Sequence, residues 1–403
     1  MKQPVSVLLV AVGGYGGSYL SALLDRFGAD KARIVGAVDP QPERCSRLDD
    51  LRALDVPICE TMEEFYDERS AELAVISSPI QWHRHQTCVA LDNGSHVLCE
   101  KPLGAVIQDA QRMVEARDAA GRFVAIGYQW SFSEAIQRLK RDVRAGLLGQ
   151  PVRMKTLVLW PRTHGYYARN GWAGARRDAE GRWVLDSPVN NATAHYLHNM
   201  FFCLGEEWNS SARPADVQGE LYRANRITNY DTGALRCFTE EGVEILYIAT
   251  HAGHGRHGPV FEYEFERGIV RCEGGGEPIV ARLDDGSERE YGEPYNGPDR
   301  KLEQCLEAVR TGAEPACTVE AAAAQTLCMN GLQESPPRIT EFPEELVRVT
   351  GDGDERRTWV EGLDEALTRC YEEWSLPTEA GLEWAVPGRL VGLDDYRQFP
   401  RKP

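Results

Sequence analysis

The sequence predicts an α/β fold in which a doubly wound parallel sheet is followed by a second domain built on an antiparallel meander. Up to Ile126, short runs rich in valine and isoleucine alternate with helical patterns. Beyond Ile126, strand-like runs follow one another with turn signals such as EEG, ERG and DDG between some of them. The length of 403 residues also exceeds what one ordinary core accommodates, which favours two domains.

The first domain is expected to contain six strands. Their apolar runs read VSVLLV, ARIVGAV, VPICE, ELAVI, HVLCE and RFVAI. Runs that are apolar on both faces are typical of a parallel sheet covered on both sides. Helical patterns at 17–27, 83–93 and 105–120 supply covering helices, and right-handed crossovers would give an open doubly wound sheet.

The second domain is expected to begin with a helix over 134–145 that Gly146 ends. A strand PVRMKTLVLW, a long irregular segment and a helix over 191–204 follow. The expected meander comprises the runs DVQGELYRA, GALRCFT, VEILYIAT, VFEYEFE and GIVRCEG, with helices over 298–311 and 319–334 after it. Residues 336–403 carry one helical piece, 363–374, and are predicted to be an extension. The predicted domains are therefore 1–126 and 127–335, with the C-terminal extension 336–403.

The composition excludes several classes of protein. A formal charge of −17 argues against a nucleic-acid or anionic-membrane partner, since both need clustered lysine and arginine. The eleven scattered cysteines contain no Cys-x-x-Cys pair and fit a reducing compartment. The start MKQPVSVLLVAV imitates a signal peptide, but a glycine cluster follows where a cleavage site would be needed. We therefore expect a cytoplasmic protein.

A glycine-rich turn directly follows the first strand. In VAVGGYGG, the fingerprint positions hold Ala11, Gly13 and Gly16, with Gly14 and Tyr15 between them. Gly13 would let the backbone approach a pyrophosphate, and Gly16 would let helix and strand pack closely. The helix N-terminus offers N–H groups to phosphates. A purely structural tight turn is the alternative interpretation.

The second predicted strand supports the binding interpretation because it ends in Asp39, 23 residues after Gly16. An acid at this place accepts the ribose hydroxyls of an adenosine and repels a 2′-phosphate. The sequence therefore predicts NAD as cofactor, while the nearby Arg44 keeps NADP as the less favoured alternative.

With the fingerprint, three further motifs make the chain resemble the glucose–fructose oxidoreductase / inositol dehydrogenase (Gfo/Idh/MocA) family. They are SSPIQWH at 77–83, EKP at 100–102 and NNATAHYLHNMFFCLG at 190–205. The resemblance covers roughly residues 5–335. It implies a Rossmann domain, a second domain with a large, mostly antiparallel open sheet, and oxidation or reduction of sugars and polyols with a nicotinamide cofactor.

The EKP motif ends the fifth strand, at the edge where an open α/β sheet binds its ligands. The resemblance implies that Lys101 lies beside the nicotinamide and hydrogen-bonds the substrate hydroxyl, with Pro102 fixing its direction. A surface ion pair that ends a strand is the alternative. The resemblance also assigns cofactor contacts to Ser78, Pro79, His83, Glu100, Gln129 and Trp130.

Hydride transfer needs a group that takes or returns the hydroxyl proton. Free lysine is a poor base at neutral pH, whereas histidine titrates in the useful range. His195 matches the family's histidine ten residues before Gly205, and a core histidine is its alternative role. Asn191 stands where the family often has aspartate, and His198 stands where aspartate is also common. The expected division is a proton carried by His195, an oxygen polarised by Lys101 and positioned by Asn191, and His198 in contact with substrate. Asp186 is a candidate source of the missing charge.

An aromatic and arginine-rich segment, 160–183, precedes that helix. It holds three tryptophans, two tyrosines and five arginines without a helical or strand period. Aromatic faces stack on sugar rings, and arginine and asparagine bind polar substituents. We expect substrate contacts from Arg162, Tyr167, Asn170 and Trp172, with an oligomer interface as a compatible alternative.

The stretch HAGHGRHG places His251, His254 and His257 three residues apart. Interleaved glycines indicate a loop, and no acid or cysteine completes a ligand set nearby. We predict no metal site, but a polar turn from which one histidine could reach the substrate.

The sequence thus predicts an NAD(H)-dependent sugar, polyol or glycoside oxidoreductase with a small-molecule carbohydrate or polyol substrate. By resemblance it is expected to form a homodimer or homotetramer through the exposed face of the second sheet. Two alternatives remain: NAD-assisted glycoside cleavage by oxidation and elimination, and a non-catalytic nucleotide or sugar sensor.

Overall fold

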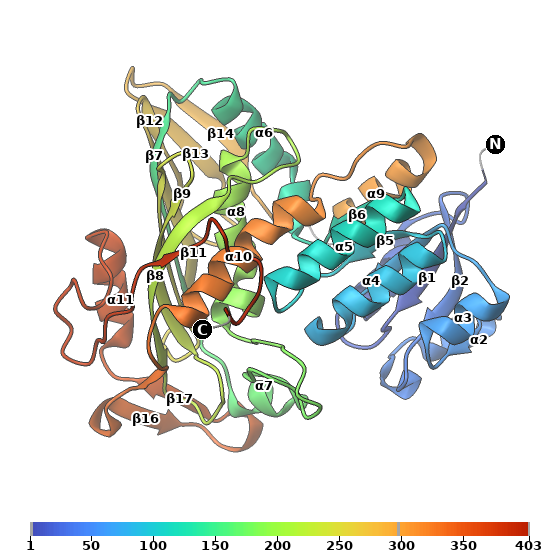
Figure 1. Cartoon of the computed structure of the whole chain (residues 1–403), viewed down its shortest axis with the longest axis horizontal. Coiled ribbons are helices and arrows are strands. Elements are labelled where there is room, and N and C mark those ends of the chain that lie inside the picture. The colour runs from blue at the N-terminus through green and yellow to red at the C-terminus, as the bar shows by residue number, and fades with distance from the viewer. Residues whose placement is uncertain (1–2, 296–298, 402–403) are drawn as a thin grey trace. The chain divides into compact units, whose positions relative to one another are not determined.

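A computed structural model describes residues 3–295 and 299–401. The chain divides into two compact units. The first takes in the described residues within 1–104, 108–133 and 296–323, and the second those within 105–107, 134–295 and 324–403. Figure 1 labels the elements of both units.

The first unit contains a six-stranded sheet with the order β3-β2-β1-β4-β5-β6, in which every neighbouring pair is parallel. This confirms the predicted doubly wound sheet. The order reverses between β1 and β4, which is the switch point where open α/β sheets bind ligands. The strands are β1 (Val5–Val10), β2 (Ala32–Val38), β3 (Ile58–Cys59), β4 (Leu73–Ile76), β5 (His96–Cys99) and β6 (Val124–Ile126).

The helices of this unit differ from expectation in two places. The helix predicted over 17–27 is α1 (Gly16–Ser21), continued by a π-helical turn, Ala22–Arg26. Helix α9 (Asp299–Thr311), expected in the second domain, groups with the first unit, where its Lys301 is buried; residue 298, its expected start, lies outside the described residues. The other helices are α2 (Leu48–Ala53), α3 (Met62–Glu68), α4 (His83–Asp92) and α5 (Ile107–Ala120).

The second unit is built on a ten-stranded sheet. Its main path runs β14-β13-β12-β11-β7-β10-β9-β8-β15, and β18 pairs with β8. Most pairs are antiparallel, while β7–β10 and β8–β15 are parallel. The strands are β7 (Pro151–Leu159), β8 (Pro214–Arg223), β9 (Thr232–Thr239), β10 (Glu244–Thr250), β11 (His257–Phe265), β12 (Gly268–Cys272), β13 (Ile279–Leu283), β14 (Glu288–Gly292), β15 (Thr340–Glu341) and β18 (Val391–Gly392).

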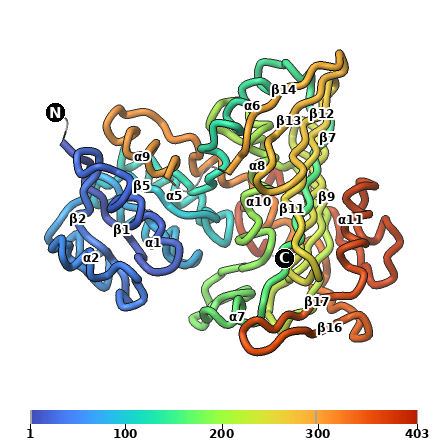
Figure 2. Tube along the Cα trace, turned by 180° about the vertical axis from the view of Figure 1, so that it is seen from behind, coloured from blue at the N-terminus to red at the C-terminus, as the bar shows by residue number. Residues whose placement is uncertain are grey.

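The two faces of this sheet are covered by different parts of the chain. Figures 1 and 2 show helix α8 (Ala194–Leu204) on one side and helix α11 (Leu363–Glu372) on the other. Side chains along β7 alternate accordingly, because successive strand residues point to opposite faces. The Thr156 hydroxyl contacts the Met200 sulfur of α8, whereas Leu157 belongs to an apolar cluster shared with Leu367 of α11. Helices α6 (Glu134–Arg144), α7 (His164–Ala168) and α10 (Val319–Glu334) complete the set.

The described part of the predicted extension, residues 336–401, packs onto the second sheet. Strands β15 and β18 add to β8, and strands β16 (Val347–Thr350) and β17 (Arg357–Val360) form a separate two-stranded sheet. The helical piece predicted over 363–374 is α11. The tail strands are short and lie in charged, proline-rich sequence, so no alternation of apolar and polar residues predicted them.

Within the described residues, no helix combines the length and apolarity needed to cross a membrane. All eleven cysteines have free thiols.

Candidate functional site

The strands of the parallel sheet end in one row. Val10 of β1 pairs with Val38 of β2 and with Ile76 of β4, Ile76 pairs with Cys99 of β5, and Cys99 pairs with Ile126 of β6. The residues that follow these strands therefore emerge along the same edge. They are the glycine-rich turn, Asp39, Ser78 with Pro79, Glu100 with Lys101, and Gln129 with Trp130. The topology thus brings most of the predicted cofactor residues to a single edge.

The glycine-rich turn has the backbone that its sequence pattern requires. Ala11 has φ +64° and Gly14 has φ +54°, both in the left-handed region that favours glycine. At Gly16, the first residue of α1, an added Cβ would lie 1.9 Å from the carbonyl oxygen of Ala11. Only glycine therefore allows α1 to start this close to the end of β1. This close approach fits the fingerprint of a dinucleotide-binding turn.

Asp39 braces this turn. Its Oδ2 accepts hydrogen bonds from the backbone N–H of Val12 at 3.0 Å and of Gly13 at 3.3 Å, and its Oδ1 accepts one from Gln41 N–H at 2.8 Å. The carboxylate that is expected to bind ribose therefore also fixes the shape of the phosphate-binding turn. A carboxylate has about four acceptor positions, so ribose hydroxyls can be added to these bonds. The turn and Asp39 together fit an NAD-type cofactor.

His83 connects two of the strand-end loops. Its Nδ1 lies 2.8 Å from the carbonyl oxygen of Pro102 and its Nε2 lies 2.9 Å from that of Ser78. The side chain is buried, and burial lowers its pKa. The imidazole thus holds the Lys101–Pro102 turn against the Ser78–Pro79 loop. The ring is almost completely buried, and in the structure it links the two loops by these contacts.

Glu100 forms a buried ion pair that was not predicted from the sequence. Its Oε1 accepts hydrogen bonds from the Lys301 ammonium of α9 and from the Tyr19 hydroxyl of α1, the latter at 2.6 Å. Burial alone would raise the pKa of Glu100, but Lys301, Tyr19 and Lys101 lower it overall. The carboxylate that ends β5 therefore anchors α9. No sequence signal could have found a partner 201 residues away.

Lys101 follows this anchor at the same edge, where its side chain is half-buried. Its backbone N–H donates to Glu100 Oε2 at 3.2 Å, so the ion pair also restrains the backbone of the predicted catalytic lysine. Gln129 and the buried Trp130 lie in a 3₁₀ turn, Gln129–Phe132, close after β6. Both loops therefore begin where parallel neighbouring strands end.

In the second unit, His195 lies in the first turn of α8 and is half-buried. Asn191 lies outside that helix, in a π-helical turn, Pro188–Ala192, that Thr193 separates from α8. The helix predicted over 191–204 therefore begins only at Ala194, and Asn191 precedes it. Asn191 Nδ2 instead donates to Asp186 Oδ1 at 2.7 Å. Asp186 thus supplies the carboxylate beside Asn191, as considered from the sequence.

His198 lies in the core of the second unit. None of its surface is exposed, and its ring lies 5.6 Å from that of Phe202. Burial, with a smaller contribution from Lys140, lowers the pKa of His198 to about 3. A neutral, fully enclosed ring offers no surface to a substrate. The structure therefore favours a packing role for His198 over the predicted contact.

The 160–183 segment contains one short helix, α7, where no periodicity was expected. The side chains of Arg162, Tyr167, Asn170 and Trp172 are all half-buried. Asn170 has a local role, since its Oδ1 accepts from the N–H groups of Trp172 at 3.1 Å and Ala173 at 2.8 Å. Tyr167 reaches toward His251, with 3.5 Å between its hydroxyl and Nδ1. Burial, and next Asp231, raise the pKa of Tyr167 well above its usual value.

The three histidines of HAGHGRHG have separate surroundings. His251 follows β10 and is buried, His254 packs 4.5 Å from the Trp359 ring of the tail, and His257 begins β11. Asp364 of α11 accepts hydrogen bonds from the N–H groups of His254 and Gly255. The loop therefore anchors the tail. Across residues 3–295 and 299–401, no group of three or more histidine, cysteine or acidic side chains is placed to hold a metal ion.

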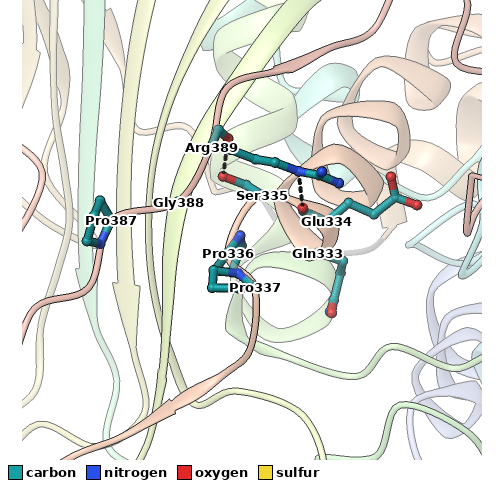
Figure 3. A pocket seen from close by; sticks show the side chains of 8 residues that line it. All are labelled: Gln333, Glu334, Ser335, Pro336, Pro337, Pro387, Gly388 and Arg389. Atoms are coloured by element: carbon teal, nitrogen blue, oxygen red, sulfur yellow. Dashed lines mark hydrogen bonds between the residues drawn. The ribbon is translucent and has the colours of Figure 1, made fainter. Parts of the chain in front are cut away.

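A cavity of ≈ 640 Å³ lies elsewhere in the second unit, where the tail returns to the end of α10 (Figure 3). Ser335 Oγ donates to the carbonyl oxygen of Arg389 at 2.7 Å, and Arg389 Nε donates to that of Glu334 at 3.3 Å. None of the predicted catalytic or binding residues lines this cavity. Its lining combines four polar residues with three prolines and a glycine, and since no predicted site residue contributes, we do not assign the chemistry to it.

Comparison with known proteins agrees with this geometry. Residues 5–128 match the model of an oxidoreductase family with an NAD-binding Rossmann fold, Gfo/Idh/MocA. The chain is 29% identical over 135 residues to a 1,5-anhydro-D-fructose reductase of Ensifer adhaerens, covering 33% of this chain and 39% of the relative. It is 31% identical over 157 residues to an inositol 2-dehydrogenase of Saccharopolyspora erythraea, covering 38% and 45%. The matched part is thus less than half the length of each relative.

The similarity to known proteins in fold covers more of the chain than the similarity in sequence. The WlbA dehydrogenase from Bordetella pertussis, solved in complex with NADH and UDP-GlcNAcA, superposes with a TM-score of 0.67 at 20% identity. The superposition covers 82% of this chain and 95% of that one. At 20% identity, this match shows a shared fold only. Residues 5–128, with their glycine-rich turn and strand-end lysine, thus match the NAD-binding domain of the Gfo/Idh/MocA oxidoreductase family.

Proposed function

We propose that the protein is an NAD(H)-dependent oxidoreductase acting on a carbinol of a sugar, polyol or glycoside. The observation that carries this proposal is the row of strand ends, where Asp39 braces the glycine-rich turn and Lys101 emerges two strands beyond β1. The family match of residues 5–128 and the names of the relatives support the same reaction class.

The cofactor, when bound, supplies the hydride acceptor or donor. The turn of Gly13 to Gly16 would hold the pyrophosphate, and Asp39 would accept hydrogen bonds from the adenosine ribose. Because that carboxylate repels a 2′-phosphate, NAD is favoured over NADP. His83 and Glu100 hold the loops at this edge in place by their buried contacts. The remaining proposed cofactor residues are Tyr15, Ser78, Pro79, Lys101, Gln129 and Trp130.

Three residues would handle the substrate oxygen and its proton. Lys101 donates a hydrogen bond to the reacting oxygen, and His195 takes the hydroxyl proton at a ring nitrogen. Asn191, held by Asp186, orients the same hydroxyl. Arg162, Tyr167 and Trp172 are the proposed contacts with the rest of the substrate, while Asn170 holds their loop.

We further propose a cytoplasmic location, which the eleven free thiols support. A homodimer or homotetramer would have to use a surface other than the sheet face that α11 and the tail cover. Size-exclusion chromatography with light scattering would measure the oligomeric state directly.

The test is a panel of neutral and acidic sugars, polyols and glycosides with NAD and NADP, followed by absorbance and by product analysis. We expect NADH formation that Lys101→Ala abolishes, whereas the loss of NAD affinity measured by calorimetry is only partial. Lys31→Ala, an exposed lysine, is the matched control. Bound NAD without turnover of any substrate would indicate the sensor, and a cleaved glycoside without net NADH would indicate oxidation and elimination.

A further inference from the structure

Five residues of the second unit form what we call the arginine–tyrosine cluster: Arg162, Tyr166, Tyr167, Arg169 and His251. The guanidinium carbons of Arg162 and Arg169 lie 4.5 Å and 3.6 Å from the centre of the Tyr166 ring. Backbone contacts hold the cluster together. Arg162 N–H donates to the His251 carbonyl at 3.1 Å, and Arg169 Nη1 donates to the Tyr166 carbonyl at 2.6 Å. Both cations are therefore gathered around one aromatic ring.

Neither guanidinium has a carboxylate within ion-pair distance among the described residues. On β7, β9 and β12 of the same unit, Arg153, Arg236 and Arg271 each pair with a glutamate. The Nε of Arg162 is moreover buried without a hydrogen-bond partner. Since a buried donor left unsatisfied costs free energy, such a site is suited to an incoming acceptor.

The Nε2 of His251 is a second buried nitrogen without a hydrogen-bond partner. The side chain of His251 is 2% exposed. Burial, followed by Arg162 and Arg169, lowers the pKa of His251 well below its usual value. The ring is therefore neutral at pH 7, and it can donate one hydrogen bond to a ligand without bringing a third charge.

The two nearby acids are committed elsewhere. Asp186 accepts from Gly174 N–H at 2.6 Å and from Asn191 Nδ2 at 2.7 Å. Asp231 Oδ2 accepts from the N–H groups of Ala224 and Asn225 and from Asn225 Nδ2, at 2.7 to 3.0 Å. These bonds satisfy the carboxylates inside the unit. Asp186 also acts electrostatically on Tyr166 and Tyr167 of the cluster while it holds Asn191 of the proposed reaction centre.

We propose that the arginine–tyrosine cluster binds an anionic oxygen group of the substrate, so that the enzyme acts on an acidic sugar derivative. Carboxylate and phosphate groups both match the planar donor fork of a guanidinium. The tyrosine faces would pack against the sugar ring. This inference rests on the proposed oxidoreductase function and narrows its substrate class.

The first test measures binding without catalysis. The full chain is titrated calorimetrically with glucose, glucuronate and glucose 6-phosphate at low and moderate salt. We expect an acidic sugar to bind at least about tenfold more tightly than glucose, and added salt to weaken it. The better of the two acids identifies the group as carboxylate or phosphate. Equal binding of neutral and acidic sugars would overturn the inference.

The second test uses variants. Arg162→Gln and Arg169→Gln should each raise the Kd, and in turnover the KM, of the acidic sugar about tenfold or more with little change in kcat. Arg162→Lys should recover part of the loss. Arg177→Gln is the matched control, since this arginine of the same segment stacks on Trp183, 3.4 Å from its ring centre.

The two proposals fail separately. Turnover of neutral sugars with a KM that Arg162→Gln leaves unchanged would contradict the anion-binding proposal. The proposed oxidoreductase function would still hold. Charge-dependent binding of an acidic sugar without NADH formation from any sugar would keep the site and sink the oxidoreductase.

Discussion

The two sheets of this protein are covered in different ways. The strands of the parallel sheet mostly alternate with its helices along the chain, while α9 joins from far beyond β6. The second sheet receives α8 on one face, but its other face is covered by residues beyond 336, more than a hundred positions after β7. Because strands and helices alternate along the chain, the first arrangement could be predicted from the sequence. The second depends on contacts between distant segments, which periodicity does not encode.

The tail also contacts the proposed substrate segment within the second unit. His164 of α7 donates its backbone N–H to the Arg356 carbonyl at 2.7 Å, and its Nε2 lies 2.9 Å from Thr358 Oγ1. Figure 2 shows α7 and strands β16 and β17 at the same end of the sheet. The segment that carries Arg162 and Tyr166 is thus held partly by the tail.

The largest effect is expected at the long-range contact of the first unit. Glu100→Gln leaves the Lys301 ammonium buried beside a neutral amide, and removing one partner of a buried ion pair costs about 3–5 kcal/mol. Urea unfolding would measure this loss. Replacing both partners, Glu100→Gln with Lys301→Met, should recover much of it, because no uncompensated charge remains.

The same pair predicts a pH dependence. The folded-state pKa of Glu100 lies below its ordinary 4.5, so the pair's contribution is complete above that pH. It is lost as the pH falls through the lower, folded-state value. The difference in unfolding free energy between wild type and Glu100→Gln should therefore shrink below about pH 4.5. A constant difference down to pH 3 would contradict the role of the ion pair.

Leu367→Ala tests whether the tail is an integral cover of the second sheet. The side chain is fully buried in the cluster with Leu157 and Ile248, and its loss should cost roughly 3 kcal/mol in urea unfolding. Leu390→Ala, at a tail leucine that is 62% exposed, is the control and should change stability by less than about 0.5 kcal/mol. Equal effects of the two variants would show that the tail packs nonspecifically.

Asp39→Ser separates the cofactor role of the strand-end acid from its bracing role. We expect NAD affinity to fall about tenfold, or roughly 1.4 kcal/mol, and the preference over NADP to narrow. Calorimetry with both nucleotides measures this change. Glu43→Gln is the control, because this exposed acid lies four residues on and has an arginine 3.5 Å away. An unchanged preference for NAD over NADP would show that Asp39 only stabilises the glycine-rich turn.

Ala11→Gly should have the smallest effect, and it should be stabilising. The left-handed φ of +64° strains alanine by about 1 kcal/mol, and the greater flexibility of unfolded glycine offsets part of the gain. Ala119→Gly, at an exposed position of α5, should instead destabilise by up to about 1 kcal/mol. Thermal unfolding of both variants would show opposite shifts, and shifts of the same sign would argue against strain at Ala11.

Local chemistry made several features predictable before any coordinates. The glycine-rich turn, Asp39 and Lys101 each follow an apolar run, and parallel strands must bring their carboxyl ends to one edge. Helix α10 was predicted at its observed bounds, 319–334. These inferences depend on residues close in sequence, where spacing and side-chain type determine the backbone.

Other features arose only when distant segments met. Lys301 neutralises Glu100 from 201 residues away, and His251 lies beside a tyrosine 84 residues earlier. The tail strands and the face they cover belong to the same group. Burial gives these contacts their strength, and which groups become buried together depends on how the whole chain packs, so neither composition nor periodicity could specify them.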